Sequence, residues 1–146
     1  MNPNYLLLVE DSDDDATLFA WAVKRSGVAV VVSRARDIPE ARRLLAGSKP
    51  SLVTLDCSLS GATGLDFLRE LRSDATLCRV PVIMLSSTES DHDVGLAYSI
   101  GANSFLRKPV SVESYTHSIQ LLLDYWFGIN CSSLPGQCAP ASVWVG

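Results

Sequence analysis

Carboxylates, one hydroxyl and one lysine stand directly after short apolar runs of this 146-residue sequence. They are Glu10, Asp11, Asp56, Ser86 and Lys108. Three carboxylates brought close together repel each other, and a hard divalent cation such as Mg²⁺ removes that conflict. The lysine and the hydroxyl would offer donors to an anion, and a carboxylate beside a metal can form an acyl phosphate. The residue types are therefore suited to phosphoryl chemistry, provided that the fold brings them together.

Asp56 is the residue around which the other four would gather. It ends the apolar run 52–55, which Pro50 precedes and turn-forming residues follow, a pattern typical of a buried strand. Taken alone, Asp56 is explained more simply as a cap of a turn or of the next helix. The polar residues at the ends of the other apolar runs favour a ligand-binding site instead, because ligands of open α/β sheets bind outside the carboxyl ends of the strands.

Apolar strand patterns alternate with helical patterns from residue 5 to about residue 126. The expected strands are 5–9, 28–32, 52–56, 80–85 and 104–106. Helix caps are expected at Asp37, Ser90 or Asp91, and Ser111, and helix ends at Gly27, Gly47 and Gly101. This order predicts a five-stranded parallel sheet flanked by five helices, a flavodoxin-like doubly wound fold. Right-handed crossovers would place every strand's carboxyl end at one edge.

Composition is typical of one globular domain. Hydrophobic residues make up 47% of the chain and charged residues 19%, which argues against disorder. A net charge of −4 without a basic stripe argues against nucleic-acid binding. No apolar run approaches the roughly 20 residues that cross a bilayer, and the N-terminus lacks a basic signal-peptide region. The four cysteines lack C-x-x-C spacing, so no zinc site is expected, and we expect a cytoplasmic protein.

Two segments are expected along the chain. Residues 1–127 hold all the strand and helix patterns and should form the domain. Residues 128–146 are punctuated by glycine and proline, and they are expected to be a tail without a separate effector domain.

The motifs Glu10-Asp11, Asp56, Ser86 and Lys108-Pro109 resemble, in this order, the signature of response-regulator receiver domains over residues 5 to about 126. The resemblance implies a switch in a His–Asp two-component relay, not an enzyme with a separate substrate. It implies that Asp56 accepts the phosphoryl group and that Ser86 and Lys108 bind its oxygens.

The resemblance also implies a metal site and a switch. The Mg²⁺ ligands would be Asp11, Asp56 and the backbone carbonyl of Ser58, with Glu10 reaching the metal through water. Phe105 would be the aromatic switch residue that couples to Ser86.

The loop 59–64 departs from the family pattern, because it lacks the usual proline and acidic residue. Without proline the loop is less preset. An alternative therefore remains: a receiver-like binding module that acts without phosphorylation.

The chain ends suggest a branch of the family. The Leu-Leu-Val-Glu-Asp motif at 7–11, the aromatic segment 125–130 and the following Leu134-Pro135 are similar to single-domain regulators paired with bacterial phytochrome kinases. The implied partner is a sensor histidine kinase, such as a bacteriophytochrome, or a phosphotransfer protein.

The last helix carries more apolar positions than a core face needs. A helical wheel places Val112, Tyr115, Ile119, Leu122, Leu123 and Trp126 toward the core. Leu121 and Tyr125 point away from it. We therefore expect a two-fold homodimer through this helix, with the neighbouring surface of the fourth helix and fifth strand and with the tail. The tail could instead cover the helix of its own subunit.

Overall fold

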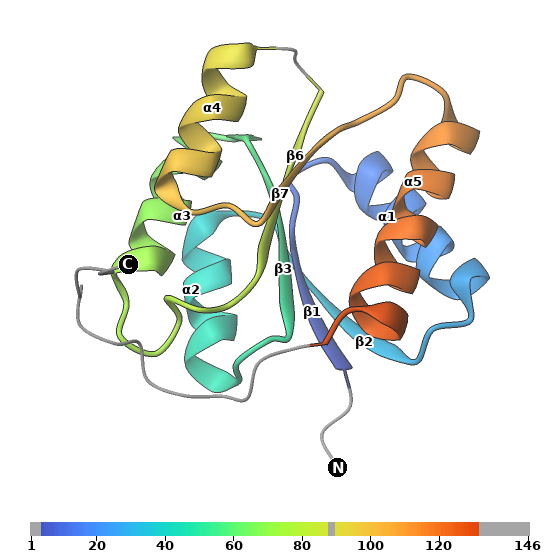
Figure 1. Ribbon diagram of the computed structural model, residues 1–146, viewed down its shortest axis with the longest axis horizontal. Helices are drawn as coiled ribbons and strands as arrows, with labels where there is room; N and C mark the ends of the chain where they lie inside the picture. Colours follow the sequence, from blue (N-terminus) through green and yellow to red (C-terminus); the bar gives the residue numbers. More distant parts are fainter. Residues whose placement is uncertain (1–3, 88–89, 132–146) are drawn as a thin grey trace, which may run out of the picture.

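The computed structural model describes residues 4–87 and 90–131. One five-stranded sheet runs through its centre with the order β2-β1-β3-β6-β7, and all its pairings are parallel (Figure 1). Its strands are β1 Asn4–Val9, β2 Val30–Ala35, β3 Leu52–Asp56, β6 Val82–Ser86 and β7 Ser104–Arg107. The helices are α1 Asp13–Ser26, α2 Ile38–Gly47, α3 Gly64–Ser73, α4 Asp91–Ile100 and α5 Val112–Asp124. The predicted fold class is confirmed.

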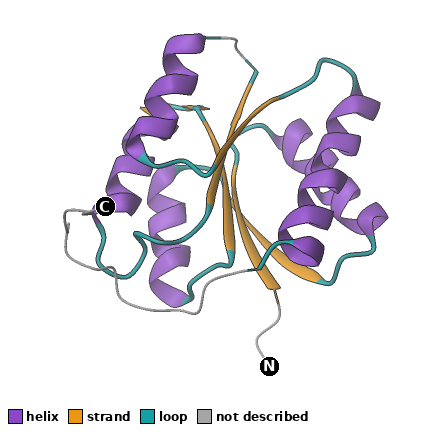
Figure 2. Ribbon diagram, in the orientation of Figure 1, coloured by secondary structure: helices purple, strands orange, loops and turns teal. Residues whose placement is uncertain are grey.

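The helices form two layers, one on each face of the sheet (Figure 2). Helices α1 and α5 pack against each other on one face, and α2, α3 and α4 cover the other (Figure 1). In β1, Leu6 and Leu8 belong to the core under α1 and α5, whereas Leu7 and Val9 belong to the opposite core. Apolar side chains on both faces explain why the strand runs are continuously hydrophobic.

Helix starts follow the capping pattern closely. An N-cap side-chain oxygen accepts the N–H of the residue three positions later in each of the five helices, at Ser12, Asp37, Thr63, Ser90 and Ser111. The caps predicted at Asp37, Ser90 and Ser111 are confirmed.

Several boundaries differ from the expected ones. Strand β2 begins two residues and ends three residues later than predicted, since its register with β1 extends to Ala35 opposite Val9. A two-residue hairpin, β4 Ser58–Leu59 with β5 Ala62–Thr63, was not predicted because strands this short give no periodic signal.

The last helix also differs from its prediction. It ends at Asp124 and continues as a π-helical turn, η1 Tyr125–Ile129. The core face was assigned correctly for Tyr115, Ile119, Leu122 and Leu123. Val112 was assigned wrongly: it is the first residue of the helix and is 45% exposed. The division between residues 127 and 128 stays a prediction, and the tail residues 132–146 lie outside the described residues.

Candidate functional site

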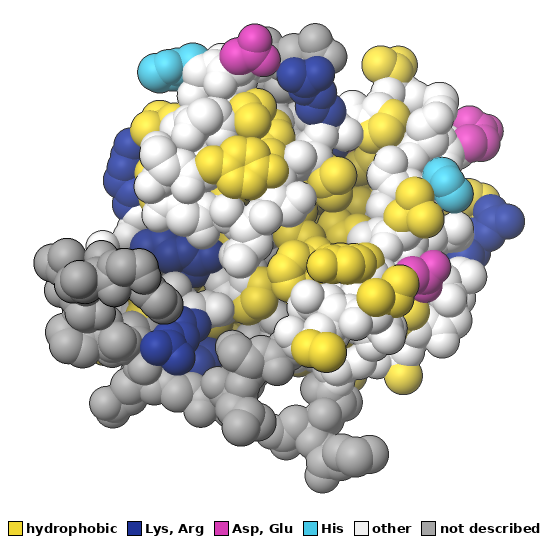
Figure 3. Space-filling model, in the orientation of Figure 1, with side chains coloured by type: hydrophobic (Ala, Val, Ile, Leu, Met, Phe, Trp, Pro, Cys, Tyr) yellow, Lys and Arg dark blue, Asp and Glu magenta, His cyan; other side chains and the backbone are white. Residues whose placement is uncertain are grey.

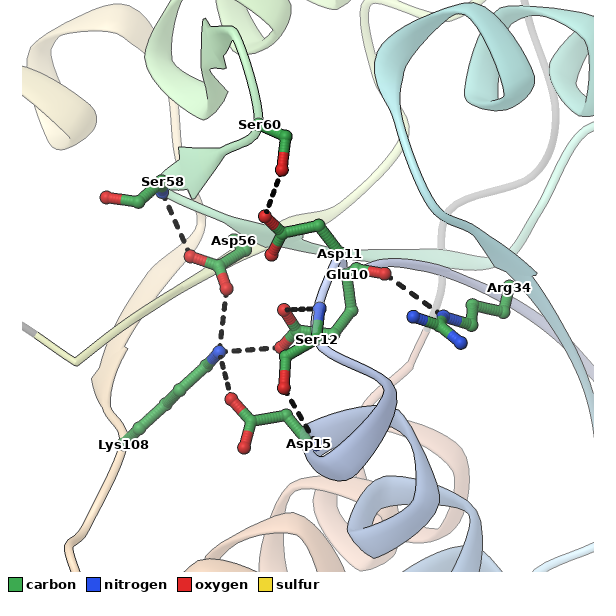
Figure 4. A network of polar contacts seen from close by, with 9 residues as sticks. All are labelled: Glu10, Asp11, Ser12, Asp15, Arg34, Asp56, Ser58, Ser60 and Lys108. Carbon is green, nitrogen blue, oxygen red and sulfur yellow. Dashed lines mark hydrogen bonds and ion pairs between the residues drawn. The ribbon is translucent and has the colours of Figure 1, made fainter.

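Lys108 is at the centre of the site, just beyond the carboxyl end of β7. Its ammonium contacts three carboxylates: Glu10 Oε1 at 2.6 Å, Asp56 Oδ2 at 2.7 Å and Asp15 Oδ2 at 2.8 Å (Figure 4). The Lys108 side chain is only 8% exposed. The structure thus gathers residues that are up to 98 positions apart in sequence around one buried cation.

Parallel pairing explains why these side chains meet. Glu10 follows β1, Asp56 ends β3 and Ser86 ends β6, and these three strands are neighbours in the sheet. The backbone N–H of Lys108 donates to the carbonyl of Ser86 at 2.7 Å, which fixes the start of the lysine side chain. On the other side, the Arg34 guanidinium donates to the Glu10 carbonyl at 3.0 Å.

Glu10, Asp11 and Asp56 form an acidic cluster that can hold a divalent cation. One carboxylate oxygen from each lies within 4.8 Å of the others. Glu10 and Asp56 are buried, whereas Asp11 is partly exposed and leaves the cluster open to solvent on its side. Oxygen donors of this kind suit Mg²⁺, which keeps several water ligands beside one or two carboxylates.

The charges in the cluster perturb each other. Burial, assisted by the neighbouring Asp56, raises the pKa of Glu10 to about 7. Burial alone would lower the pKa of the Lys108 ammonium, but its contacts with Asp15, Asp56 and Glu10 outweigh burial and raise it. Lys108 therefore stays charged, and the protein concentrates more negative charge than one ammonium can neutralise.

The β4–β5 hairpin closes the site from the side. The Ser58 N–H donates to Asp56 Oδ1 at 2.9 Å, and the Ser60 hydroxyl donates to Asp11 Oδ2 at 2.9 Å (Figure 4). Gly64 approaches so closely that a Cβ added there would collide with the carbonyl oxygen of Asp56. A loop without the usual proline is thus held by the site's own carboxylates.

Ser86 is buried at the end of β6, and Phe105 lies half-buried against the core under α2, α3 and α4. The Ser86 side chain forms a hydrogen bond with Cys57. Burial raises the pKa of the Cys57 thiol to about 11, as is typical of a small packing residue.

Two residues near the site were missed by sequence reasoning. Asp15 lies in the acidic first turn of α1 and had no predicted role at the site, and Tyr115 was assigned only to the core. Tyr115 is buried, and its hydroxyl has no hydrogen-bond partner among residues 4–87 and 90–131. Burial raises the pKa of Tyr115, and the charges of Lys108, Glu10, Asp15 and Asp56 also act on it.

The predicted interface residues are exposed. Leu121 is 55% exposed and Tyr125 49% exposed, and the Tyr125 ring meets Trp126 edge to face at 5.7 Å between centroids. Figure 3 shows further hydrophobic side chains over α4, β7 and α5 on the same side of the molecule. Of the described helices, none has the length and apolar character to cross a membrane.

Fold and site together define a class of signalling module with a metal-binding acidic cluster at the carboxyl edge of a doubly wound sheet. The family model of the response regulator receiver domain matches residues 6–120. The chain belongs to this family, whose members signal within two-component systems.

Relatives of similar length extend the comparison. The chain is 34% identical over 140 residues to the probable methanogenesis regulatory protein FilR2 of Methanothrix harundinacea, covering 92% of this chain and 90% of the relative. It is 28% identical over 131 residues to the response regulator Rcp1 of Synechocystis sp., covering 85% of this chain and 89% of the relative.

Solved structures agree with this assignment. The Mn²⁺-bound form of Rcp1 superposes with a TM-score of 0.85 at 26% identity, covering 90% of this chain and 100% of the other. The phosphorylated cyanobacterial phytochrome response regulator RcpA gives a TM-score of 0.85 at 28% identity, covering 90% and 99%. Regulators linked to phytochromes are therefore among the relatives of this chain.

Proposed function

We propose that this protein is a phosphorylatable response regulator that accepts a phosphoryl group on Asp56 in a His–Asp relay. The observation that carries the proposal is the convergence of Lys108 with Glu10 and Asp56 beside Asp11. A carboxylate oxygen of Asp56 would attack the phosphorus atom, and the phosphohistidine nitrogen would be the leaving group.

The family resemblance suggests the metal and donor roles, and the acidic cluster of Glu10, Asp11 and Asp56 supports them. Asp11, Asp56 and the Ser58 carbonyl would hold Mg²⁺, and Glu10 would bind it through water. The cation would neutralise charge on the transferring phosphoryl oxygens. Lys108 would donate to one phosphoryl oxygen in place of a carboxylate that it contacts in the free protein.

The signal would pass through Ser86 and Phe105. Ser86 would donate its hydroxyl to a phosphoryl oxygen, and the half-buried Phe105 ring would follow this movement. The partner would be a sensor histidine kinase or a phosphotransfer protein, and the likeness to Rcp1 and RcpA favours a bacteriophytochrome kinase.

Phosphorylation by acetyl phosphate with Mg²⁺, followed by intact-protein mass spectrometry, tests the proposal. Wild type should gain one phosphoryl group, and Asp56→Asn should gain none, because an amide is not a nucleophile here. Asp14→Asn, in the exposed first turn of α1, is the matched control and should react like wild type. Labelling of Asp56→Asn would refute the assignment of the acceptor, and an unreactive wild type would favour the module that acts without phosphorylation.

We also propose a homodimer through α5. The exposed Leu121 and Tyr125, continued by Ile129 at 74% exposure, support an interface on the α4, β7 and α5 side. Leu121→Glu with Tyr125→Glu should give a folded monomer in sedimentation equilibrium, whereas His117→Glu on the same helix should leave the dimer. A wild type that stays monomeric with and without beryllofluoride would remove this proposal.

A further inference from the structure

Asp15 contacts the site without belonging to the acidic cluster. It lies in the first turn of α1, and its N–H donates to the N-cap hydroxyl of Ser12 at 3.2 Å. Its carboxylate meets the Lys108 ammonium at 2.8 Å and stays 33% exposed. Because the cap holds the Asp15 backbone, the carboxylate is directed at Lys108 by the start of the helix.

The Lys108 ammonium has no donor to spare while Asp15 holds it. An ammonium offers three N–H donors, and the three carboxylates Glu10, Asp56 and Asp15 each lie within 2.8 Å of Nζ. A cation in the acidic cluster would engage Glu10 and Asp56, whereas Asp15 is outside that cluster. Asp15 is then the carboxylate that keeps its contact with Lys108.

Figure 4 shows Asp15 and Asp56 on opposite sides of the Lys108 ammonium. A phosphoryl group on Asp56 would approach this ammonium from the Asp56 side and would need one of its N–H donors. Asp15 opposes that contact, because its carboxylate attracts the ammonium toward α1 and its negative charge repels the phosphoryl oxygens.

We propose that Asp15 is a positioning residue that competes with a phosphoryl group on Asp56 for the Lys108 ammonium and thereby lowers the affinity of the site for that group. This inference rests on the proposed function, since it concerns the same acceptor. Asp15 would bias the protein toward its unphosphorylated state without touching the phosphoryl group.

Beryllofluoride, a stable analogue of the phosphoryl group, measures this effect at saturating Mg²⁺. Asp15→Ala and Asp15→Asn should bind it about three- to tenfold more tightly than wild type, the size of one charge-assisted contact at a partly exposed position. Asp14→Asn removes the same charge from the same helical turn and should stay within about twofold. Asp15 variants that bind no more tightly than Asp14→Asn would overturn the proposal.

A second measurement observes Lys108 itself. In ¹H–¹⁵N spectra of metal-free protein with labelled lysine, the Lys108 ammonium should exchange slowly in wild type and Asp14→Asn and fast in Asp15→Ala. A general loss of helix stability would not single out this one signal. Equal exchange in all three proteins would refute the positioning role. If wild type bound no beryllofluoride, the proposed function would fail, and this signal would still decide whether Asp15 positions Lys108.

Discussion

Two partly or fully buried cations lie at opposite ends of the sheet, and their surroundings differ. Lys108 lies at the carboxyl ends of the strands among the carboxyl groups of three side chains. Arg72, from α3, lies at the amino ends. It donates to the carbonyls of Gly101 at 2.9 Å and Val80 at 2.8 Å, and to Asn103 Oδ1 at 3.0 Å. Val80 lies just before β6, and Asn103 lies just before β7.

Arg72 is a structural cation, whereas Lys108 is a cation whose partners can be exchanged. The partners of Arg72 are neutral dipoles, mostly backbone oxygens, which no ligand can replace without unfolding the segment. Burial lowers the pKa of the Arg72 guanidinium, whereas the pKa of Lys108 is raised by its carboxylates despite burial. Carboxylates can exchange this ammonium for a metal ion, so the end of the sheet with carboxyl partners is the one where partners can change.

The largest expected effect is the loss of Arg72. Arg72→Ala should lower the free energy of unfolding by about 3 kcal/mol, because several buried carbonyl oxygens lose their donor. Arg69→Ala, on the same helix in an exposed pair with Asp66, should cost about 0.5 kcal/mol. Urea unfolding gives both values. Mg²⁺ affinity of the Arg72 variant should match that of wild type, and a large change would contradict the separation of the two ends.

Removal of the Lys108 ammonium should lower the free energy of unfolding by less than the loss of Arg72 does. Mg²⁺ should restore part of this stability. Lys108→Met leaves three carboxylates without their cation, so the metal-free protein should lose about 2 kcal/mol at neutral pH. Because Mg²⁺ would then bind a more negative cluster, it should raise the melting temperature of this variant more than that of wild type. An equal metal-induced shift in both proteins would show that Lys108 and the metal do not share partners.

Neutralising Glu10 should stabilise the metal-free protein by about 1 to 2 kcal/mol near pH 8. Its pKa in the folded protein is raised from 4.5 to about 7, so the folded state holds the proton more tightly than the unfolded state does. Wild-type stability therefore falls as pH rises from about 4.5 to about 7. Glu10→Gln should flatten this part of the stability–pH curve and weaken Mg²⁺ binding. An unchanged pH profile would contradict the assignment.

The sequence was sufficient to locate the cluster around Lys108 at the carboxyl ends of the strands, but not the contacts of Arg72 at their amino ends. Glu10, Asp56 and Lys108 could be placed together, because parallel strands bring their carboxyl ends to one edge. Arg72 could not be recognised, since backbone oxygens bind it and carry no residue-specific signal. Helical periodicity also could not tell which of the three aspartates at 13–15 turns toward Lys108, because that depends on how α1 enters from β1.

The smallest predicted effect concerns the Tyr115 hydroxyl beside the exchangeable end. This buried oxygen has no partner among the described residues, so Tyr115→Phe should raise the free energy of unfolding by about 1 kcal/mol. Thr54→Val in the middle of β3 removes a second such hydroxyl, away from the carboxyl edge, and should act alike in urea unfolding. The charges of Lys108, Glu10, Asp15 and Asp56 act on the Tyr115 hydroxyl. If Tyr115→Phe also altered beryllofluoride affinity while Thr54→Val did not, the hydroxyl would belong to the switching end of the sheet. Destabilisation by Tyr115→Phe would mean that the hydroxyl is bonded after all.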